Sequence, residues 1–129
     1  DGWVDGVDII PADFAEAEFA AGGLSERVEV RRGAALDVLA DLANEIDDGS
    51  VDFAFLDAHK PEYSEYFRLI RPLLAPGAIL AADNVLGTGP GWIDSGYGTD
   101  EFNRIVATDP DFLATAFPMR EGLLVARRV

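Results

Sequence analysis

Two short apolar runs, each followed by an aspartate, constrain the fold of this chain more than any other feature. The run Val51–Leu56 ends at Asp57, and the run Ala78–Ala82 ends at Asp83 and Asn84. Apolar runs of this length are typical of buried parallel strands. Parallel neighbours are joined by a crossover helix, so their carboxyl ends meet at one edge of the sheet. The sequence therefore predicts a strand–helix–strand unit that places both aspartates at that edge, where open α/β sheets bind ligands.

The rest of the chain alternates between helix-like and strand-like segments. The spacing of apolar residues predicts helices over 12–21, 34–46, 62–74 and 99–107, the last with Thr99 as its N-cap. Further strands are predicted over 3–9, 27–32, 112–117 and 123–129, the last two as an antiparallel hairpin. Residues 86–98 contain five of the 13 glycines and are predicted to form a long binding loop or lid. Repeated strand–helix–strand units favour an α/β fold with a mainly parallel sheet.

The charge of the chain limits the partners that we expect. There are 24 acidic and 10 basic residues, for a formal net charge of −14. Binding to nucleic acid or to an anionic membrane through bulk charge is therefore not expected. Abundant acids with a single lysine fit a halophilic protein from a high-salt cytoplasm, and an ordinary acidic protein is the alternative. No segment has the pattern of a signal peptide or the roughly 18 apolar residues of a membrane helix, so we expect a cytoplasmic protein.

The single lysine, Lys60, lies three residues after Asp57. Together with Asp83 and Asn84, these residues provide two carboxylates, an amide and an amine at predicted strand ends. Such a set could hold a hard divalent cation with a base beside it. The alternative is structural, with both aspartates capping the helices that follow them and Lys60 exposed to solvent.

Four segments resemble the cation-dependent O-methyltransferases, the family of the catechol and caffeoyl-CoA O-methyltransferases. In order, they are Gly6–Pro11, Arg27–Leu36, Asp52–Lys60 and Ala82–Val85, and the tail from Glu101 to Arg127 is also similar. The resemblance covers essentially the whole chain. It implies a Rossmann-like class I methyltransferase fold with strand order 3-2-1-4-5-7-6, in which the C-terminal strand is antiparallel.

The resemblance also implies binding of S-adenosylmethionine. The residues that match cofactor contacts are Asp8, Gly33, Ala34, Ala35, Asp57 and His59. Asp8 matches the carboxylate that accepts hydrogen bonds from the ribose hydroxyls, although an acid at a helix N-terminus is its structural alternative. Ala34 stands where many relatives have an acid, so no side-chain contact to the adenine amine is expected there.

The resemblance assigns the remaining site residues to a metal and a base. Asp57, Asp83 and Asn84 match ligands of Mg²⁺ or another divalent cation, and Lys60 matches the general base. A nearby cation and partial burial are both expected to lower the pKa of Lys60. The implied reaction is in-line methyl transfer to a hydroxyl of a small-molecule acceptor. The acceptor could be a catechol-like phenol, an acyl-CoA ester or a modified nucleoside in tRNA.

Relatives have an N-terminal segment, with a first strand and a glycine-rich turn, that this sequence does not contain. Residues 1–129 are therefore expected to be the C-terminal portion of a single methyltransferase domain, within a homodimer. The first strand would lie between strands 3–9 and 51–57. We expect that gap to be closed by direct pairing of these strands, by a strand of a partner chain or by an N-terminal segment.

Two other functions compete with the enzyme. A phospho-receiver domain has an aspartate at a strand end and a lysine, but Asp8 lacks the adjacent acid that receivers need. The lysine also follows Asp57 by only three residues, whereas a receiver has it after its last strand. A non-catalytic subunit that retains the methyltransferase fold is the second alternative.

Overall fold

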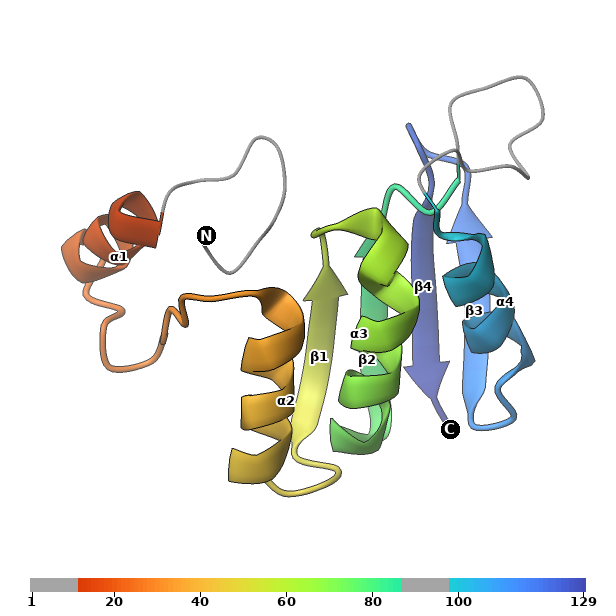
Figure 1. The fold of residues 1–129 in the computed structure, drawn as a ribbon, viewed down its shortest axis with the longest axis horizontal. Coiled ribbons are helices and arrows are strands. Elements are labelled where there is room, and N and C mark those ends of the chain that lie inside the picture. The colour runs from red at the N-terminus through yellow and green to blue at the C-terminus, as the bar shows by residue number, and fades with distance from the viewer. Residues whose placement is uncertain (1–11, 87–97) are drawn as a thin grey trace.

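The computed structural model describes residues 12–86 and 98–129, which form a four-stranded mixed sheet with helices on one face (Figure 1). The spatial order is β1-β2-β4-β3. The strands are β1 (Val51–Leu56), β2 (Leu74–Asp83), β3 (Phe112–Phe117) and β4 (Leu123–Arg128). β1 pairs in parallel with β2, whereas β4 is antiparallel to both β2 and β3. Three strands thus share one direction, and the predicted antiparallel C-terminal strand is confirmed.

The helices lie close to their predicted positions. They are α1 (Ala12–Ala21), α2 (Ala35–Glu45), α3 (Tyr63–Ile70) and α4 (Asp100–Thr108), with short 3₁₀ turns η1 (Lys60–Glu62) and η2 (Arg71–Leu73). The helix predicted over 62–74 ends early because Pro72 cannot donate the backbone hydrogen bond that a continuing helix needs. No helix within the described residues is long and apolar enough to cross a membrane.

The core lies between the sheet and helices α3 and α4. Alternate strand residues point to this side, and the buried set includes Leu56, Leu80, Ala82, Leu124 and Ala126. From the helices, Tyr63, Tyr66, Phe67 and Phe102 are buried against them. The ring of Phe102 packs edge-on against Tyr63, with centroids 5.3 Å apart. Each fully buried large apolar side chain contributes about 1.5–3 kcal/mol, so this layer holds α3 and α4 on the sheet.

The opposite face of the sheet is open among the described residues, which corrects the prediction that β1 is buried. Phe53 is 61% exposed and Phe55 is 53% exposed. Successive residues of a strand point to opposite faces, so these rings point away from Leu56 and the core. Helices α2, α3 and α4 all lie on the other side (Figure 1). The apolar run in β1 correctly predicts a strand, but not what covers it.

The prediction of a strand over 27–32 is also wrong. These residues have no regular secondary structure. A strand needs a ladder partner, and among the described residues none pairs with this segment. Its arginines form ion pairs instead: Arg31 with Glu45 at 2.6 Å and Arg32 with Glu16 at 2.8 Å.

The strand predicted over 3–9 and most of the predicted loop over 86–98 lie outside the described residues. Within the described ranges, β1 is an edge strand with β2 as its neighbour. The strand expected on the other side of β1 therefore stays a prediction.

Candidate functional site

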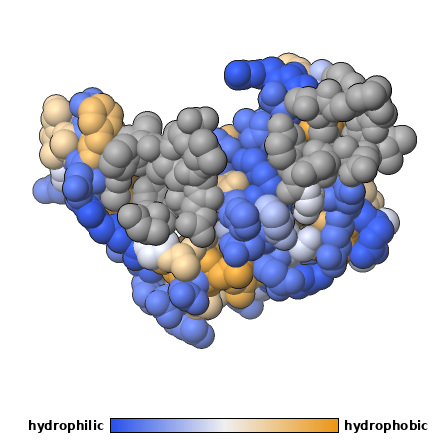
Figure 2. Space-filling view, turned by 45° about the horizontal axis from the view of Figure 1, so that its top comes forward, coloured by the Kyte–Doolittle hydropathy of each residue, from blue (hydrophilic) through white to orange (hydrophobic). Residues whose placement is uncertain are grey.

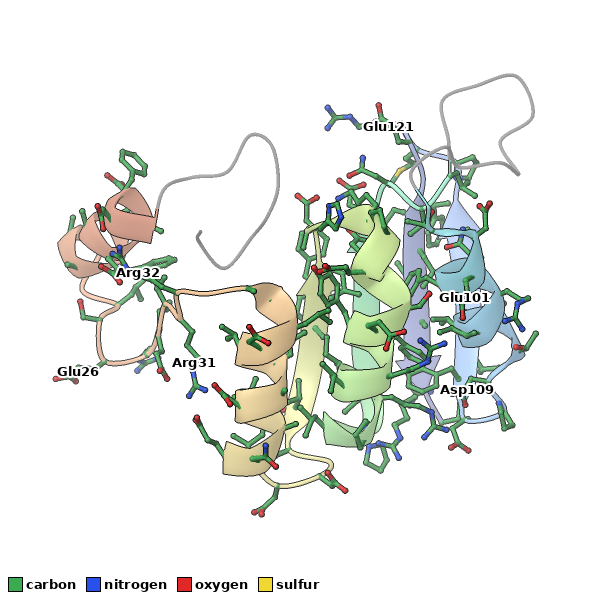
Figure 3. The ribbon with its side chains drawn as sticks, viewed as in Figure 1. Glu26, Arg31, Arg32, Glu101, Asp109 and Glu121 are labelled. Carbon is green, nitrogen blue, oxygen red and sulfur yellow. The ribbon has the colours of Figure 1, made fainter. Side chains whose placement is uncertain are left out.

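The two predicted carboxylates lie side by side at the carboxyl edge of the parallel pair. Leu56 is in register with Ala82, Asp57 follows Leu56, and Asp83 is the last residue of β2. The chain direction of β1 and β2 thus delivers both side chains to the same end of the sheet. The same end carries Glu121, in the connection between β3 and β4 (Figure 3).

Lys60 lies within hydrogen-bonding distance of this edge and is not a solvated surface lysine. Its side chain is 17% exposed, and its Nζ donates to Asp57 Oδ1 at 2.8 Å and to the Tyr63 hydroxyl at 2.9 Å. Burial lowers the pKa of Lys60, as expected, but the hydrogen bonds that the amine donates to Asp57 and Tyr63 outweigh this effect and hold the pKa above its ordinary value. The lowering expected from a nearby cation stays a prediction. Without a cation, Lys60 is held as an ammonium ion.

The hydroxyl of Tyr63 connects the ends of β1 and β2. It lies 3.0 Å from the carbonyl oxygen of Leu56 and 3.2 Å from that of Asp83. It also accepts a hydrogen bond from the backbone N–H of Ala58 at 3.3 Å. Tyr63 is fully buried, and burial raises the pKa of its phenol. The hydroxyl therefore keeps its proton and can donate it to a carbonyl. Sequence reasoning missed this residue, because its spacing fits the apolar face of α3 equally well.

Asn84 begins the turn after β2 in the left-handed conformation, at φ 57°. Asparagine tolerates this region better than most residues. Its backbone N–H donates to Asp83 Oδ1 at 2.8 Å, and its side-chain amide donates to Glu121 Oε2 at 3.5 Å. Because the amide nitrogen faces Glu121, the amide oxygen is the atom left for a cation or another ligand. Glu121 is a second residue that the sequence did not single out.

Val85, the next residue of the turn, is held by two side chains, one from the N-cap residue of α4 and one from within the helix. The carbonyl oxygen of Val85 accepts hydrogen bonds from Thr99 Oγ1 at 2.9 Å and from Asn103 Nδ2 at 2.6 Å. Thr99 is the N-cap residue of α4, as predicted. Its hydroxyl bonds Val85, and no side-chain capping hydrogen bond is present. We call Thr99, Asn103 and Val85 the Val85 clamp.

The chemistry of the predicted ligands fits a hard divalent cation. Among the described residues no group of three or more His, Cys, Asp or Glu could hold a metal ion. The predicted set contains two carboxylates, with the amide oxygen of Asn84 as its third member, and Mg²⁺ accepts such oxygens together with water. Asp57 does not cap the following turn, because His59 occupies the cap position of η1. Its carboxylate is 2.8 Å from the Lys60 amine.

The predicted cofactor residues are brought together in part. Ala35 and Asp57 line one cavity of about 440 Å³, whose walls are mostly apolar side chains of α2, β1 and α3. Ala34 is the N-cap residue of α2 and provides no side-chain cap, and Gly33 before it has φ 146°, a conformation that favours glycine. The His59 side chain is exposed, and Asp8 lies outside the described residues. Figure 2 shows a mainly hydrophilic surface with hydrophobic surface exposed near the lower centre of the view.

Comparison with known proteins places this geometry in context. A family model described as O-methyltransferase matches residues 1–129. Tricin synthase 2 from Oryza sativa subsp. japonica is 34% identical over 119 residues, which cover 83% of this chain and 41% of that protein. A catechol O-methyltransferase from Niastella koreensis is 40% identical over 78 residues, 60% of this chain and 35% of that protein. The chain thus spans less than half the length of these relatives.

Solved structures show the same fold. The O-methyltransferase from Bacillus cereus, in complex with SAH, superposes with a TM-score of 0.77 at 30% sequence identity. The match covers 92% of this chain and 58% of that one. The predicted Rossmann-like α/β fold is confirmed by this agreement.

Proposed function

The chain belongs to the O-methyltransferase family, and from this premise we propose that the complete protein transfers a methyl group from S-adenosylmethionine to a hydroxyl of a small molecule. We propose further that the reaction depends on Mg²⁺ or another divalent cation. The observation that carries this proposal is the sheet edge at which Asp57, Asp83 and Lys60 meet. Residues 1–129 would form the C-terminal portion of the catalytic domain.

The proposed metal ligands are Asp57, Asp83 and the amide oxygen of Asn84. A divalent cation bound there would supply positive charge that lowers the pKa of an acceptor hydroxyl and that of the neighbouring lysine. The Asn84 amide is oriented for this role by its hydrogen bond to Glu121. The backbone of the turn is fixed by the Val85 clamp.

Lys60 is the proposed general base. Its Nζ would accept the proton of the acceptor hydroxyl, and the oxygen would then attack the methyl group of the sulfonium. Asp57 and Tyr63 hold the amine at the sheet edge, so little reorganisation is needed before proton transfer. Positioning of this kind can supply a large part of a rate enhancement.

The proposed cofactor site is the part of the cavity nearest Asp57, at the carboxyl end of β1; the cavity itself extends along the strand from Val51 onward. Ala35 and Asp57 line it, and Gly33, Ala34, His59 and Asp8 are the other proposed contacts. The Bacillus cereus relative, solved in complex with SAH, supports binding of this class of cofactor. For the acceptor we propose a catechol-like phenol or an acyl-CoA ester, as in the names of the relatives. A homodimer, a cytoplasmic location and adaptation to high salt stay predictions.

The family match removes the phospho-receiver alternative and leaves the non-catalytic subunit to be tested. Isothermal titration calorimetry of the complete protein with S-adenosylmethionine, with and without Mg²⁺, separates the two remaining cases. An active enzyme should bind the cofactor and then turn over a catechol in the presence of Mg²⁺. A protein that binds no cofactor under either condition would contradict the proposed function. The same titration can be made with Asp57→Asn, which changes a proposed metal ligand. The variant Asp48→Asn, in an exposed turn, is its control.

A further inference from the structure

The buried hydroxyl of Tyr63 is the point where Lys60 meets the backbone of both candidate strand ends. Four groups lie around this one oxygen: the Lys60 amine, the Ala58 N–H, and the carbonyl oxygens of Leu56 and Asp83. A phenol has one proton to donate and lone pairs to accept. The amine and the N–H therefore donate to it, and its own proton is shared between the two carbonyls, at 3.0 and 3.2 Å.

The hydroxyl is not needed for packing. The ring of Tyr63 contacts Phe102 edge-on at 5.3 Å and Tyr66 at 6.0 Å between centroids, and a phenylalanine would fill the same space. Placing a hydroxyl in a fully buried position costs free energy unless it is hydrogen-bonded. A satisfied buried network of this kind restricts the groups that it joins to one arrangement.

The groups that it joins are those of the proposed reaction. A lysine side chain has many rotamers, so its amine needs fixed partners to stay in one place. Asp57 is one partner, but it is also a proposed cation ligand. The neutral Tyr63 hydroxyl can hold Nζ without competing for that cation, and it holds the backbone of Asp83 at the same time.

We propose that Tyr63 is a positioning residue of the methyl-transfer site, whose hydroxyl fixes the Lys60 amine relative to the ends of β1 and β2. This proposal rests on the proposed function. It differs from a structural role because the loss of one hydroxyl should change turnover more than stability.

The test compares Tyr63→Phe with Thr108→Val in the complete protein. Thr108→Val also removes one hydroxyl, but that hydroxyl donates to the carbonyl of Arg104 at 2.8 Å on the exposed surface of α4, outside the cavity proposed for the cofactor. We expect Tyr63→Phe to lower kcat about 10–100-fold, the range seen when a supporting partner is removed, with little change in KM for the cofactor. Thr108→Val should leave kcat near wild type. Equal kcat values for the two variants would overturn the proposal.

A double-mutant cycle tests whether Tyr63 acts through the lysine. If it does, adding Tyr63→Phe to Lys60→Ala should reduce kcat much less than Tyr63→Phe reduces it alone. Full additivity would contradict the proposal. A Lys60→Ala variant with wild-type turnover would instead contradict the role of Lys60 in the proposed function.

A measurement that does not depend on turnover separates a failure of the positioning role of Tyr63 from a failure of the proposed function. Lysine labelled with ¹⁵N at Nζ gives a side-chain NMR signal for Lys60, assigned by its loss in Lys60→Arg. We expect Tyr63→Phe to shift this signal and Thr108→Val to leave it in place. An unchanged signal in Tyr63→Phe would overturn the positioning role, whether or not the protein is an active enzyme. If Tyr63→Phe does not fold, 4-aminophenylalanine at position 63 keeps a polar group there. A folded protein of that kind should retain kcat within a few-fold, and a loss as large as that of Lys60→Ala would contradict the proposal.

Discussion

The amine of Lys60 lies 2.8 Å from a carboxylate oxygen of Asp57 and 2.9 Å from the hydroxyl of Tyr63. These two contacts attach the one lysine of the chain to the carboxyl ends of two parallel strands. A proposed base, a proposed metal ligand and a buried tyrosine hydroxyl are thus assembled within seven residues of sequence. The predictions below follow from this cluster and from the network around it.

Lys60→Ala should lower kcat of the complete protein about 10²–10⁴-fold, the usual effect of losing a general base. Cofactor affinity, measured by calorimetry, should change little. Lys60→Arg should not restore turnover, because an arginine side chain does not give up its proton. Arg104→Ala, on the exposed side of α4, is the control for loss of a positive charge. Wild-type turnover in Lys60→Ala would show that the amine takes no part in the chemistry.

Thr99→Val should destabilise the protein by about 0.5–1.5 kcal/mol, because it removes one of the two donors to the carbonyl of Val85. Denaturant unfolding measures the change. Thr108→Val is the matched control, since its hydroxyl bonds a carbonyl on the exposed surface of the same helix. If the two variants lose the same stability, the Val85 clamp does not hold the turn after β2.

The ion pair of Arg71 with Asp109 should make the free energy of unfolding depend on pH in the acidic range. Nε of Arg71 lies 2.5 Å from Asp109 Oδ2, and this contact lowers the pKa of the Asp109 carboxyl. A carboxyl with a lowered folded-state pKa stabilises the fold above its unfolded pKa, about 3.9, and loses that contribution as pH falls through the folded value.

At pH 7 we therefore expect Asp109→Asn to lose on the order of 1 kcal/mol of stability. The loss should shrink as the pH falls below about 4. Urea unfolding at several pH values measures this difference, with Asp48→Asn as the control. A difference that does not vary with pH would exclude the linkage.

Salt should stabilise the protein. Repulsion among 24 acidic residues is screened as ionic strength rises, because the Debye length falls from about 10 Å at 0.1 M to about 3 Å at 1 M. We expect the melting temperature to rise with KCl through the molar range. A flat or falling curve would remove the inference of adaptation to high salt and would leave the enzyme proposal unaffected.

The strand ends could be predicted from sequence because each apolar run is followed by its own aspartate. Asp57 and Asp83 therefore needed only the direction of the parallel pair to be placed together. Tyr63 could not be found this way, because helical spacing explains its ring, and one contact of its hydroxyl is with Asp83, 20 positions away. The lowering of the Lys60 pKa by burial was predicted, but not the larger opposite effect of Asp57 and Tyr63, because the sequence does not show that both contact the amine.

The errors in the fold have a different origin. Hydrophobic side chains at Phe53 and Phe55 predict a strand, but their exposure depends on which other elements cover that face. The alternation over 27–32 likewise favours a strand, and a strand exists only where a partner supplies the ladder. Both are tertiary properties that a local pattern does not contain.

Metal dependence of methyl transfer tests the central claim most directly. The complete protein, treated with EDTA, would be assayed with labelled S-adenosylmethionine and a catechol, before and after addition of Mg²⁺. We predict that activity is lost in EDTA and restored by Mg²⁺ in the wild type and in Asp48→Asn. Asp57→Asn and Asp83→Asn should show little or no restoration. Methyl transfer at full rate in EDTA, or full restoration in Asp57→Asn and Asp83→Asn, would contradict the proposed cation site at the ends of β1 and β2.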